Sequence, residues 1–464
     1  MTVGARLARV RRTARALCVA GALCMAPGLF AAAAAGDDDE PPLAPPEAGV
    51  GDTKGNIGEE GGIGERGGIG ERLNQLGVTG SLRGAYWSSN RRFDDQSDIA
   101  VGSAWLKLER KLGAGIGLFA EGYLSKEDLF GDERDTSRLR EAYVEGRKEQ
   151  WDFRVGKQII AWGRTDRLNP TDNLTPRDFT LLVPEIDEDR FGSLAAKATW
   201  NLNASTSLTG IWLPEFRPNV IALPSVPGVS FDERIPDSRR QWAAKLDQSG
   251  KAIDWSVSWF DGFDLSADLS PGASSPAGQT VNLDHNRIRV LGGDAATTRG
   301  SYRFAVEAAY TRTQDTDGTN PGVKNPFFYG VFGVERDFTG DLTVIVQYFT
   351  RWVEHYSSPE NITDPAVRAV AIQQAVVNSQ YDRTQHGLSA RIAKKWLNQT
   401  LEGELAAVVL LNRNGYSFRP KLSYAASDSL KLIAGYEYFH GSDKTIYGLL
   451  EKNKGVFAEL RYFF

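Results

Sequence analysis

The chain has 464 residues, of which 41% are hydrophobic and 24% charged, and its formal net charge is −5. This acidic balance disfavours nucleic acid as a partner. No apolar run of about 18 residues occurs after Phe30, which excludes a helical membrane protein. The negative mean hydropathy, −0.35, leaves a membrane barrel open, because only alternate residues of its strands face lipid.

Residues 1–35 have the features of a secretory signal peptide. A basic start precedes the apolar stretch ALCVAGALCMAPGLF, which is too short to cross a bilayer as a helix, and Ala33 to Ala35 offer a small-residue cleavage site. A membrane anchor is the alternative. Both cysteines of the chain, Cys18 and Cys24, lie in this segment, so the mature chain is expected to have no disulfide and no thiolate site.

Residues 36–72 differ in composition from the rest of the chain. GDDDEPPLAPPEAG is acidic and proline-rich, as in a disordered periplasmic spacer. The hexapeptides GNIGEE, GGIGER and GGIGER follow, and three such units are too few for a stable solenoid. We expect a flexible periplasmic linker, with a small plug or a docking strip for a partner as alternatives.

Residues 73–464 are expected to form a β-structure. Apolar and polar residues alternate in segments such as GIGLFAEGYLS, AIDWSVSWF, SYRFAVEAAYT and DSLKLIAGYEYF. Repeated this often, the alternation predicts an all-β fold.

The connections between these segments alternate in length. Tight turns are expected near residues 112, 150, 203, 250, 299, 339, 398 and 427, and long connections at 162–190, 214–237, 263–283 and 355–380. The pattern predicts a transmembrane antiparallel β-barrel of about 18 strands, with short periplasmic turns and long extracellular loops. An even number of strands leaves both termini in the periplasm.

The last segment, GVFAELRYFF, has apolar residues at alternate positions that end in Tyr462 and Phe464, with Glu459 and Arg461 between them. One face is therefore apolar and the other charged. The pattern resembles the assembly signal of bacterial outer-membrane barrels. The resemblance implies that the partners are the barrel-insertion machinery, outer-membrane lipid and lipopolysaccharide.

A second resemblance lies in FRVGKQIIAWGRTDRLNPTDNLTPRD, residues 153–178. This stretch is similar to a strand and loop of porin-like families that include the alginate exporters. The resemblance implies a barrel and a transport role, but no particular substrate.

No residue pattern suggests catalysis. The four histidines, at 285, 355, 386 and 440, have no metal-ligand spacing, and no local pattern indicates a catalytic serine with a histidine. The glycine-rich hexads lack the lysine-serine ending of a phosphate-binding loop. We therefore expect no enzymatic activity, no catalytic residue, no cofactor and no bound metal.

The charged faces of the strands carry nearly equal numbers of basic and acidic residues. Opposite charges inside a barrel favour pairing, so many of them are expected to brace the wall. A channel for a polyanion would need a markedly positive lumen, and the balance argues against one.

The connection at 162–190 is expected to fold into the barrel and form its narrowest point. An 18-strand barrel is wider than its side chains can fill, and this loop contains three prolines and the apolar run from Phe179 to Val183. A solvated external loop is the alternative. The candidate pore-lining and constriction residues are Arg154, Gln158, Arg164, Asp166, Arg167, Asp172, Arg177, Asp178, Arg303, Glu307, Arg351 and Glu437.

The connection at 355–380 is expected to contain a helix. Asp364 is suited to cap it and Pro365 to occupy its first position. An extracellular lid and an inward plug are both open for this helix.

Together these features predict a passive channel for polar solutes in the outer membrane of a Gram-negative bacterium. The alternative is a barrel that secretes an exopolysaccharide as part of an envelope-spanning complex, linked to it through the hexads. A third hypothesis is a structural barrel that displays loops for adhesion.

Overall fold

The computed structural model describes residues 76–88, 98–113, 115–127, 129, 134–221, 223, 226–250, 252–276 and 278–464. The expected signal peptide, 1–35, and the spacer with its hexads, 36–72, lie outside the described residues. Within the described part of the chain, no helix has the length and the apolar character needed to cross a bilayer.

Eighteen antiparallel strands form a closed barrel, as the alternating sequence predicts. Each strand pairs with its neighbours in the barrel, and the barrel closes where β1 pairs with β21, with Ser81 opposite Phe463. The strands are β1 (Val78–Trp87), β2 (Ile99–Gly113), β3 (Ile116–Glu127), β4 (Arg134–Lys148), β5 (Trp151–Gln158), β6 (Ser193–Asn203), β7 (Thr206–Leu213), β9 (Gln241–Gln248), β10 (Asp254–Phe263), β13 (Arg287–Arg299), β14 (Tyr302–Arg312), β15 (Phe327–Phe338), β16 (Leu342–Val353), β17 (Thr384–Trp396), β18 (Leu401–Leu410), β19 (Gly415–Ser427), β20 (Leu430–Gly441) and β21 (Gly455–Phe463).

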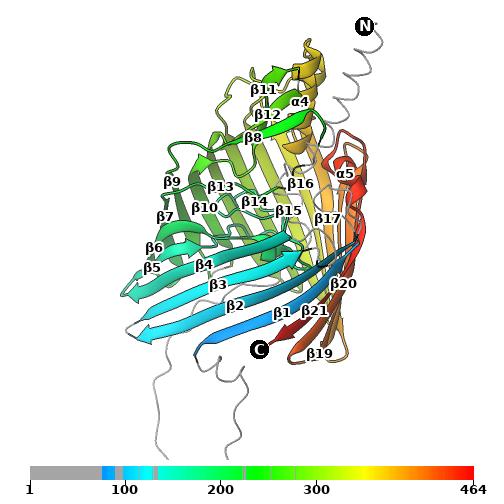
Figure 1. Ribbon diagram of the computed structural model, residues 1–464. Helices are drawn as coiled ribbons and strands as arrows, with labels where there is room; N and C mark the ends of the chain where they lie inside the picture. Colours follow the sequence, from blue (N-terminus) through cyan, green and yellow to red (C-terminus); the bar gives the residue numbers. More distant parts are fainter. Residues whose placement is uncertain are drawn as a thin grey trace, which may run out of the picture.

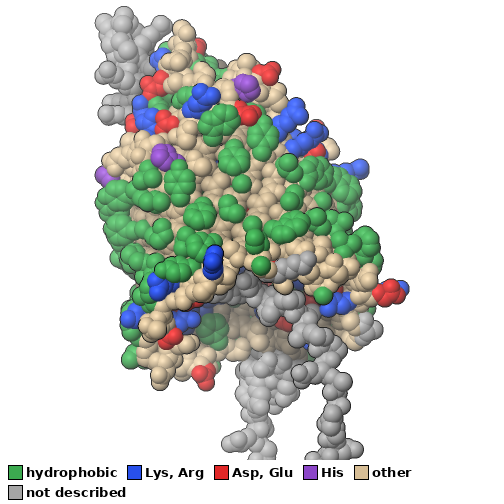
Figure 2. All heavy atoms as spheres, turned by 180° about the vertical axis from the view of Figure 1, so that it is seen from behind, with side chains coloured by type: hydrophobic (Ala, Val, Ile, Leu, Met, Phe, Trp, Pro, Cys, Tyr) green, Lys and Arg blue, Asp and Glu red, His purple; other side chains and the backbone are tan. Residues whose placement is uncertain are grey.

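Many large apolar side chains of the strands lie on the outer face of the barrel, and most of the charged side chains in the middle of the strands lie on the inner face. In β21, Leu460 and Tyr462 are 47% and 49% exposed, whereas Glu459 and Arg461 are only 4% and 6% exposed. Figure 2 shows apolar side chains spread over the middle of one outer face, with charged residues mainly above and below. This arrangement is the reverse of a soluble protein and matches strands whose outer face meets lipid.

Exposed aromatic residues form two belts around the barrel. One belt lies near the short turns and comprises Trp151, Trp200, Tyr302, Phe338, Trp396, Tyr424 and Tyr462. The other lies near the long connections and comprises Tyr86, Trp212, Trp242, Phe328, Tyr348 and Trp352.

The two belts are separated by the height of an apolar membrane layer. In β15 the belt residues Phe328 and Phe338 are ten positions apart on the same face. At about 3.3 Å per residue and a strand tilt of about 40°, the belts are roughly 25 Å apart, as in transmembrane barrels.

Short and long connections occupy opposite ends of the barrel. Eight tight turns, such as Lys148 to Trp151 and Arg299 to Tyr302, join strands at one end. The first strand begins and the last strand ends at this same end, because Leu82 of β1 lies opposite Tyr462 of β21. Figure 1 shows the C-terminus there.

The long connections carry a small outer domain at the other end. A three-stranded sheet consists of β8 (Val229–Arg234), β11 (Asp268–Ser275) and β12 (Gly278–Asp284), and β8 runs parallel to β12. Helix α4 (Pro365–Val377) packs on β11. Their contact is apolar and comprises Leu269, Val281, Leu283, Val370 and Val377. We call the sheet and α4 together the outer cap (Figure 1).

The outer cap settles two points of the sequence analysis. Asp364 caps α4 by accepting hydrogen bonds from the amides of Ala366 and Val367, as predicted. The helix lies over the end of the barrel as part of a lid, rather than as an inward plug. Three strands lie in or beside the segments 214–237 and 263–283, for which the sequence analysis expected only loops.

Four short helical segments complete the part of the chain that the structure describes. They are η3 (Ile186–Asp189), η4 (Pro359–Asn361), α5 (Ile446–Leu449) and η5 (Glu451–Asn453). α5 contacts β19 and β20 near the long-connection end, where Ile446 and Tyr447 are buried.

Candidate functional site: a loop held across the lumen

The connection from β5 to β6, residues 159–192, lies inside the barrel. We call it the inward loop. Its side chains and carbonyls contact residues on the inner face of strands β1, β4, β9, β13, β14, β16, β17, β18, β19 and β21. These strands lie on both sides of the lumen, so the loop crosses it rather than projecting into solvent.

A single buried carboxylate, Glu307 on β14, organises the first part of the loop. Its oxygens accept hydrogen bonds from the hydroxyl of Thr165 and from the amide and hydroxyl of Thr171, each at 2.8 Å. Gly163 allows this approach: with a positive φ of 118°, a Cβ placed there would lie 2.5 Å from a Glu307 oxygen. Only glycine suits that position.

Arg164 ties the loop to β9 and β13. Its guanidinium lies 2.9 Å from Asp247 and 2.6 Å from Asp294. Burial acts to lower the pKa of Arg164, but the two carboxylates outweigh burial and raise it. The carbonyl of Arg164 accepts a hydrogen bond at 3.0 Å from Arg303, which also pairs with Glu335 at 3.2 Å.

Arg167 reaches a different part of the wall. It forms a 2.9 Å ion pair with Glu404 on β18, and both side chains are buried. Its neighbour Asp166 pairs with Arg391 on β17 at 3.2 Å. The backbone of Arg167 is left-handed, with φ of 64°, a conformation that costs an ordinary residue about 1 kcal/mol or more. The ion pair with Glu404 helps to hold this conformation.

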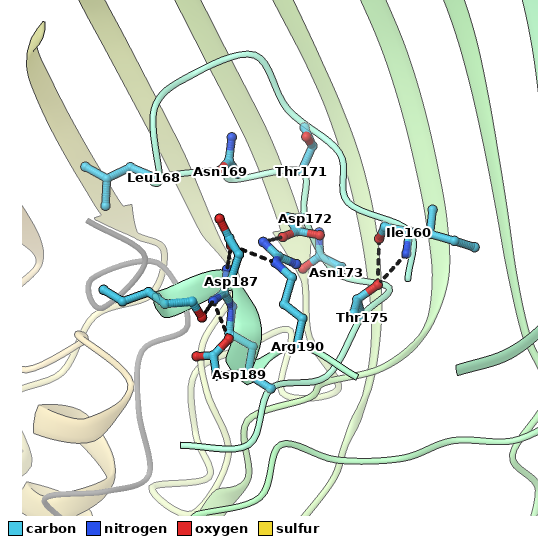
Figure 3. Close-up of polar contacts among 12 residues, drawn as sticks. Ile160, Leu168, Asn169, Thr171, Asp172, Asn173, Thr175, Asp187, Asp189 and Arg190 are labelled. Carbon is cyan, nitrogen blue, oxygen red and sulfur yellow. Dashed lines mark hydrogen bonds and ion pairs between the residues drawn. The ribbon is translucent and has the colours of Figure 1, made fainter. Parts of the chain in front are cut away.

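The rest of the loop is braced from within. Asp172 accepts from Arg190 at 2.6 Å, and Arg177 pairs with Asp189 at 2.8 Å. Figure 3 shows Asp172 and Asp187 directed toward Arg190. Burial acts to lower the pKa of Arg190, but Asp172 and Asp187 outweigh burial and raise it.

Asp189 is the exception among these carboxyls. Burial raises its pKa from 3.8 to about 6, despite the opposing effect of Arg177 and Arg190. The loop therefore contains one group that changes its charge between mildly acidic and neutral pH.

The apolar tip of the loop packs against an apolar patch inside the barrel. Phe179, Leu181, Leu182 and Val183 are all buried. Leu181 and Val183 pack in a cluster with Trp105 and Tyr123. Leu182 packs in another with Trp87, Ile99, Val101, Ile433 and Phe457.

The end of the tip is held by charged groups near the barrel seam. The carbonyl of Pro184 accepts a 2.6 Å hydrogen bond from Arg419, which also pairs with Glu437 at 3.0 Å. Glu185 pairs with Lys421 at 2.5 Å. Burial acts to raise the pKa of Glu185, but Lys421 outweighs burial and lowers it.

The structure brings most of the candidate residues together around the inward loop. Arg164, Asp166, Arg167, Arg303 and Glu307 form one connected group. Of the other candidates in the loop, Asp172 and Arg177 pair with residues of the loop itself. Asp178 pairs with Arg138 of β4 at 2.7 Å. Their charges are thus largely neutralised by protein partners.

Three candidates lie apart from this group. Arg154 pairs with Glu145 of the neighbouring strand at 2.8 Å. Gln158 is buried and donates to the carbonyl of Ala195 at 2.9 Å. Arg351 lies on β16 beneath the outer cap and donates to the carbonyl of Asn378 at 2.8 Å.

Several partners were not chosen as site residues from the sequence. Asp247, Arg391, Glu404 and Arg419 belong to the charged strand faces that alternation places inside the barrel, but they are not among the candidate site residues. Asp294 and Gln347 were missed, although Gln347 accepts from the amide of Asp166 at 3.0 Å. Their positions in the inward-facing alternation of β13 and β16 are the only signal that the sequence holds for them.

The fold and the internally anchored loop define the class: a closed 18-stranded antiparallel β-barrel with a loop folded into its lumen. OccK2 (OpdF) of Pseudomonas aeruginosa is similar at 12% identity, with 83% of this chain and 96% of that chain covered and a TM-score of 0.51. OpdL of the same bacterium is 13% identical over 84% and 98% of the two chains, with a TM-score of 0.49. The likeness at this identity concerns the fold alone.

The chain belongs to the family described as a protein of unknown function, DUF1302, which matches residues 75–445. That range covers nearly the whole barrel and the entire inward loop. A search of curated proteins gave no match.

Proposed function

We propose that this protein is an outer-membrane channel in which the inward loop restricts passage to small polar solutes. The anchoring of the loop on opposite walls carries the proposal. Arg164 binds β9 and β13, Arg167 binds β18, and the carbonyl of Pro184 binds Arg419 on β19. A barrel of this size without an obstruction would be a wide aqueous pore. The loop is therefore placed to form the constriction.

The proposal includes an orientation in the membrane. The aromatic belts and the apolar surface between them support insertion into lipid, with lipopolysaccharide at the outer leaflet. Short turns are periplasmic in bacterial outer-membrane barrels. Both ends of the barrel chain and the preceding hexads are accordingly periplasmic, and the outer cap faces the exterior of a Gram-negative cell.

Bilayer recordings test the constriction. Wild-type protein is compared with a variant in which residues 165–188 are replaced by a short Gly-Ser linker. We expect larger conductance and weaker ion selectivity from this variant. A control variant replaces the exposed stretch 237–240, in the connection that leads to β9, with Gly-Ser residues. Equal currents from the well-folded loop variant and the wild type would refute the constriction.

Export of a polysaccharide through a periplasmic complex is the alternative function, as for the alginate exporters that residues 153–178 resemble. The inward loop argues against it, because a polymer would have to displace ion pairs such as Arg167 with Glu404. Measurable conductance would indicate a channel, whereas a structural or adhesion barrel would not conduct. Loss of polymer secretion in a deletion strain would favour export.

A further inference from the structure

A cavity lies between the inward loop and the outer cap. We call it the vestibule. The loop contributes Arg167, Asp172 and Arg177, the segments at the outer end contribute Lys324 and Asn378, and the barrel wall contributes Arg351. The inference below rests on the proposed channel function and names the solute class.

The vestibule has an excess of positive charge. Four cations and two carboxylates, Asp172 and Asp264, line it. Both carboxylates have cationic partners, because Asp172 pairs with Arg190 at 2.6 Å and Asp264 with Lys324 at 2.9 Å. Their charges are therefore locally compensated.

Three of the four lining cations also have carboxylate partners. Arg167 pairs with Glu404 at 2.9 Å, and Arg177 pairs with Asp189 at 2.8 Å. Lys324 lies 2.9 Å from Asp264, with Asp268 nearby at 3.3 Å. Burial acts to lower the pKa of Lys324, but the two carboxylates outweigh burial and raise it.

Arg351 differs from the other three. Its guanidinium donates to the carbonyl of Asn378 and lies over the rings of Phe327 and Tyr329, at 4.7 and 4.9 Å from their centroids. Among the described residues, it forms no ion pair with a carboxylate. Cation–π contacts only partly offset the cost of removing such a charge from water.

A guanidinium with no carboxylate of the described residues within ion-pair distance is suited to a planar anion. Arginine presents its N–H groups as a fork that matches both oxygens of a carboxylate. Within the described part of the protein, Nη1 is the only nitrogen of Arg351 with a hydrogen-bond acceptor. Phe327, Tyr329 and Ile288 provide apolar surface beside it. We propose that Arg351 binds the carboxylate of a small organic acid whose apolar body lies against these side chains.

Calorimetric titration of the detergent-solubilised barrel tests this proposal. The probes are benzoate, its uncharged analogue benzamide and inorganic phosphate. We expect benzoate to bind the wild type more tightly than either of the others. Comparable binding of benzamide would refute the role of charge, and comparable binding of phosphate would refute the preference for an organic carboxylate. No binding of benzoate would overturn the proposal.

Variants of Arg351 then locate the site. R351Q is expected to weaken benzoate binding at least about tenfold, since a hydrogen bond to a charged group is lost. R351K, which keeps the charge but not the fork, is expected to fall between R351Q and the wild type. The matched control is R289Q. Arg289 on β13 is 61% exposed and pairs with Asp261, which keeps Arg287 as a second partner.

The results separate this inference from the channel function. Benzoate affinity in R351Q or R351K equal to the wild type would refute the inference, and loss in R289Q alone would do so too. Should R351Q fail to fold, R351K and the probe comparison on the wild type still decide. Conductance in KCl without benzoate binding would refute the anion site alone. Benzoate binding without conductance would refute the channel alone.

Discussion

The carboxylate of Glu307 accepts hydrogen bonds from both the amide and the hydroxyl of Thr171, each at 2.8 Å. These two residues are 136 positions apart in the chain. The contact fixes the inward loop to β14 at a point where Glu307 itself is fully buried. A carboxylate that accepts several hydrogen bonds satisfies its own charge and rigidifies the segment that donates them.

Replacement of Glu307 by alanine should release the first part of the loop. The donors from Thr165 and Thr171 would lose their acceptor, at a cost of roughly 1–3 kcal/mol for each buried donor left unpaired. We expect higher single-channel conductance and more current noise in E307A. The control is E145A, since Glu145 pairs with Arg154 on the neighbouring strand. A conductance of E307A equal to that of the wild type would show that the contact does not hold the constriction.

The ion pair of Arg167 with Glu404 should behave as a buried pair. Among the described residues, R167M leaves Glu404 with only the more distant Arg391, at 3.7 Å, and should destabilise the protein by roughly 3–5 kcal/mol. The double variant R167M/E404L removes the stranded charge, so it should recover part of that loss. Denaturant unfolding of detergent-solubilised protein measures both. Additive losses in the double variant would contradict a direct interaction.

The carboxyl of Asp189 should make loop stability depend on pH. Burial raises its folded pKa to about 6, above the 3.8 of the unfolded chain. Its contribution is therefore fully present below pH 3.8 and is lost as the pH rises through about 6. The loss amounts to roughly 3 kcal/mol.

The substitution D189N imitates the neutral carboxyl and gives the test. D189N removes the titrating carboxyl, so its melting temperature should fall less than that of the wild type as the pH rises from 4 to 7, whatever the cost of losing the ion pair with Arg177. The difference between the two melting curves isolates this residue from the other carboxyls of the barrel. A difference that stays the same over this pH range would refute the assignment.

The sequence predicted those features that depend on local pattern. Period-two alternation gave the strands, the turn residues gave the alternation of short and long connections, and Asp364 with Pro365 gave α4. The expectation that the loop folds inward came from its length and from the apolar run from Phe179 to Val183, which the structure buries.

The sequence did not predict features that depend on distant residues. The parallel pairing of β8 with β12 joins segments about 50 positions apart, and neither has a strong alternation of its own. The partners of the loop are also remote, since Arg167 and Glu404 are 237 positions apart. The positive charge of Arg167 does not show which of the many inward carboxylates is its partner, because the register of the strands and the path of the loop decide which carboxylate lies beside it.

The isolation of Arg351 was equally hidden. Its place among the inward residues was expected from alternation, but the absence of an ion pair with any described carboxylate depends on where Asn378 and the rings of Phe327 and Tyr329 lie. Nearly equal numbers of positive and negative residues on the inner face would suggest that every charge is paired. The structure shows which of these residues are paired.

The last residue of the chain should have two separable roles, one in the barrel seam and one in assembly. Phe464 exchanges two backbone hydrogen bonds with Gly80, at 3.0 and 3.1 Å, and its ring lies against that glycine. Deletion of Phe464 removes both bonds, which costs roughly 1 kcal/mol each.

F464D keeps the backbone pairing and changes only the side chain. We therefore expect F464D to fold from urea into detergent nearly as well as the wild type, while the deletion variant folds to a less stable barrel. In cells both variants should yield less heat-modifiable protein in the outer membrane, because we propose that the terminal aromatic residue is part of an assembly signal read by the insertion machinery. L432A, which truncates another exposed apolar side chain on β20, serves as the control and should insert normally. Wild-type levels of inserted F464D would show that the terminal ring is dispensable for assembly, and poor refolding of F464D in detergent would place its effect in the seam instead.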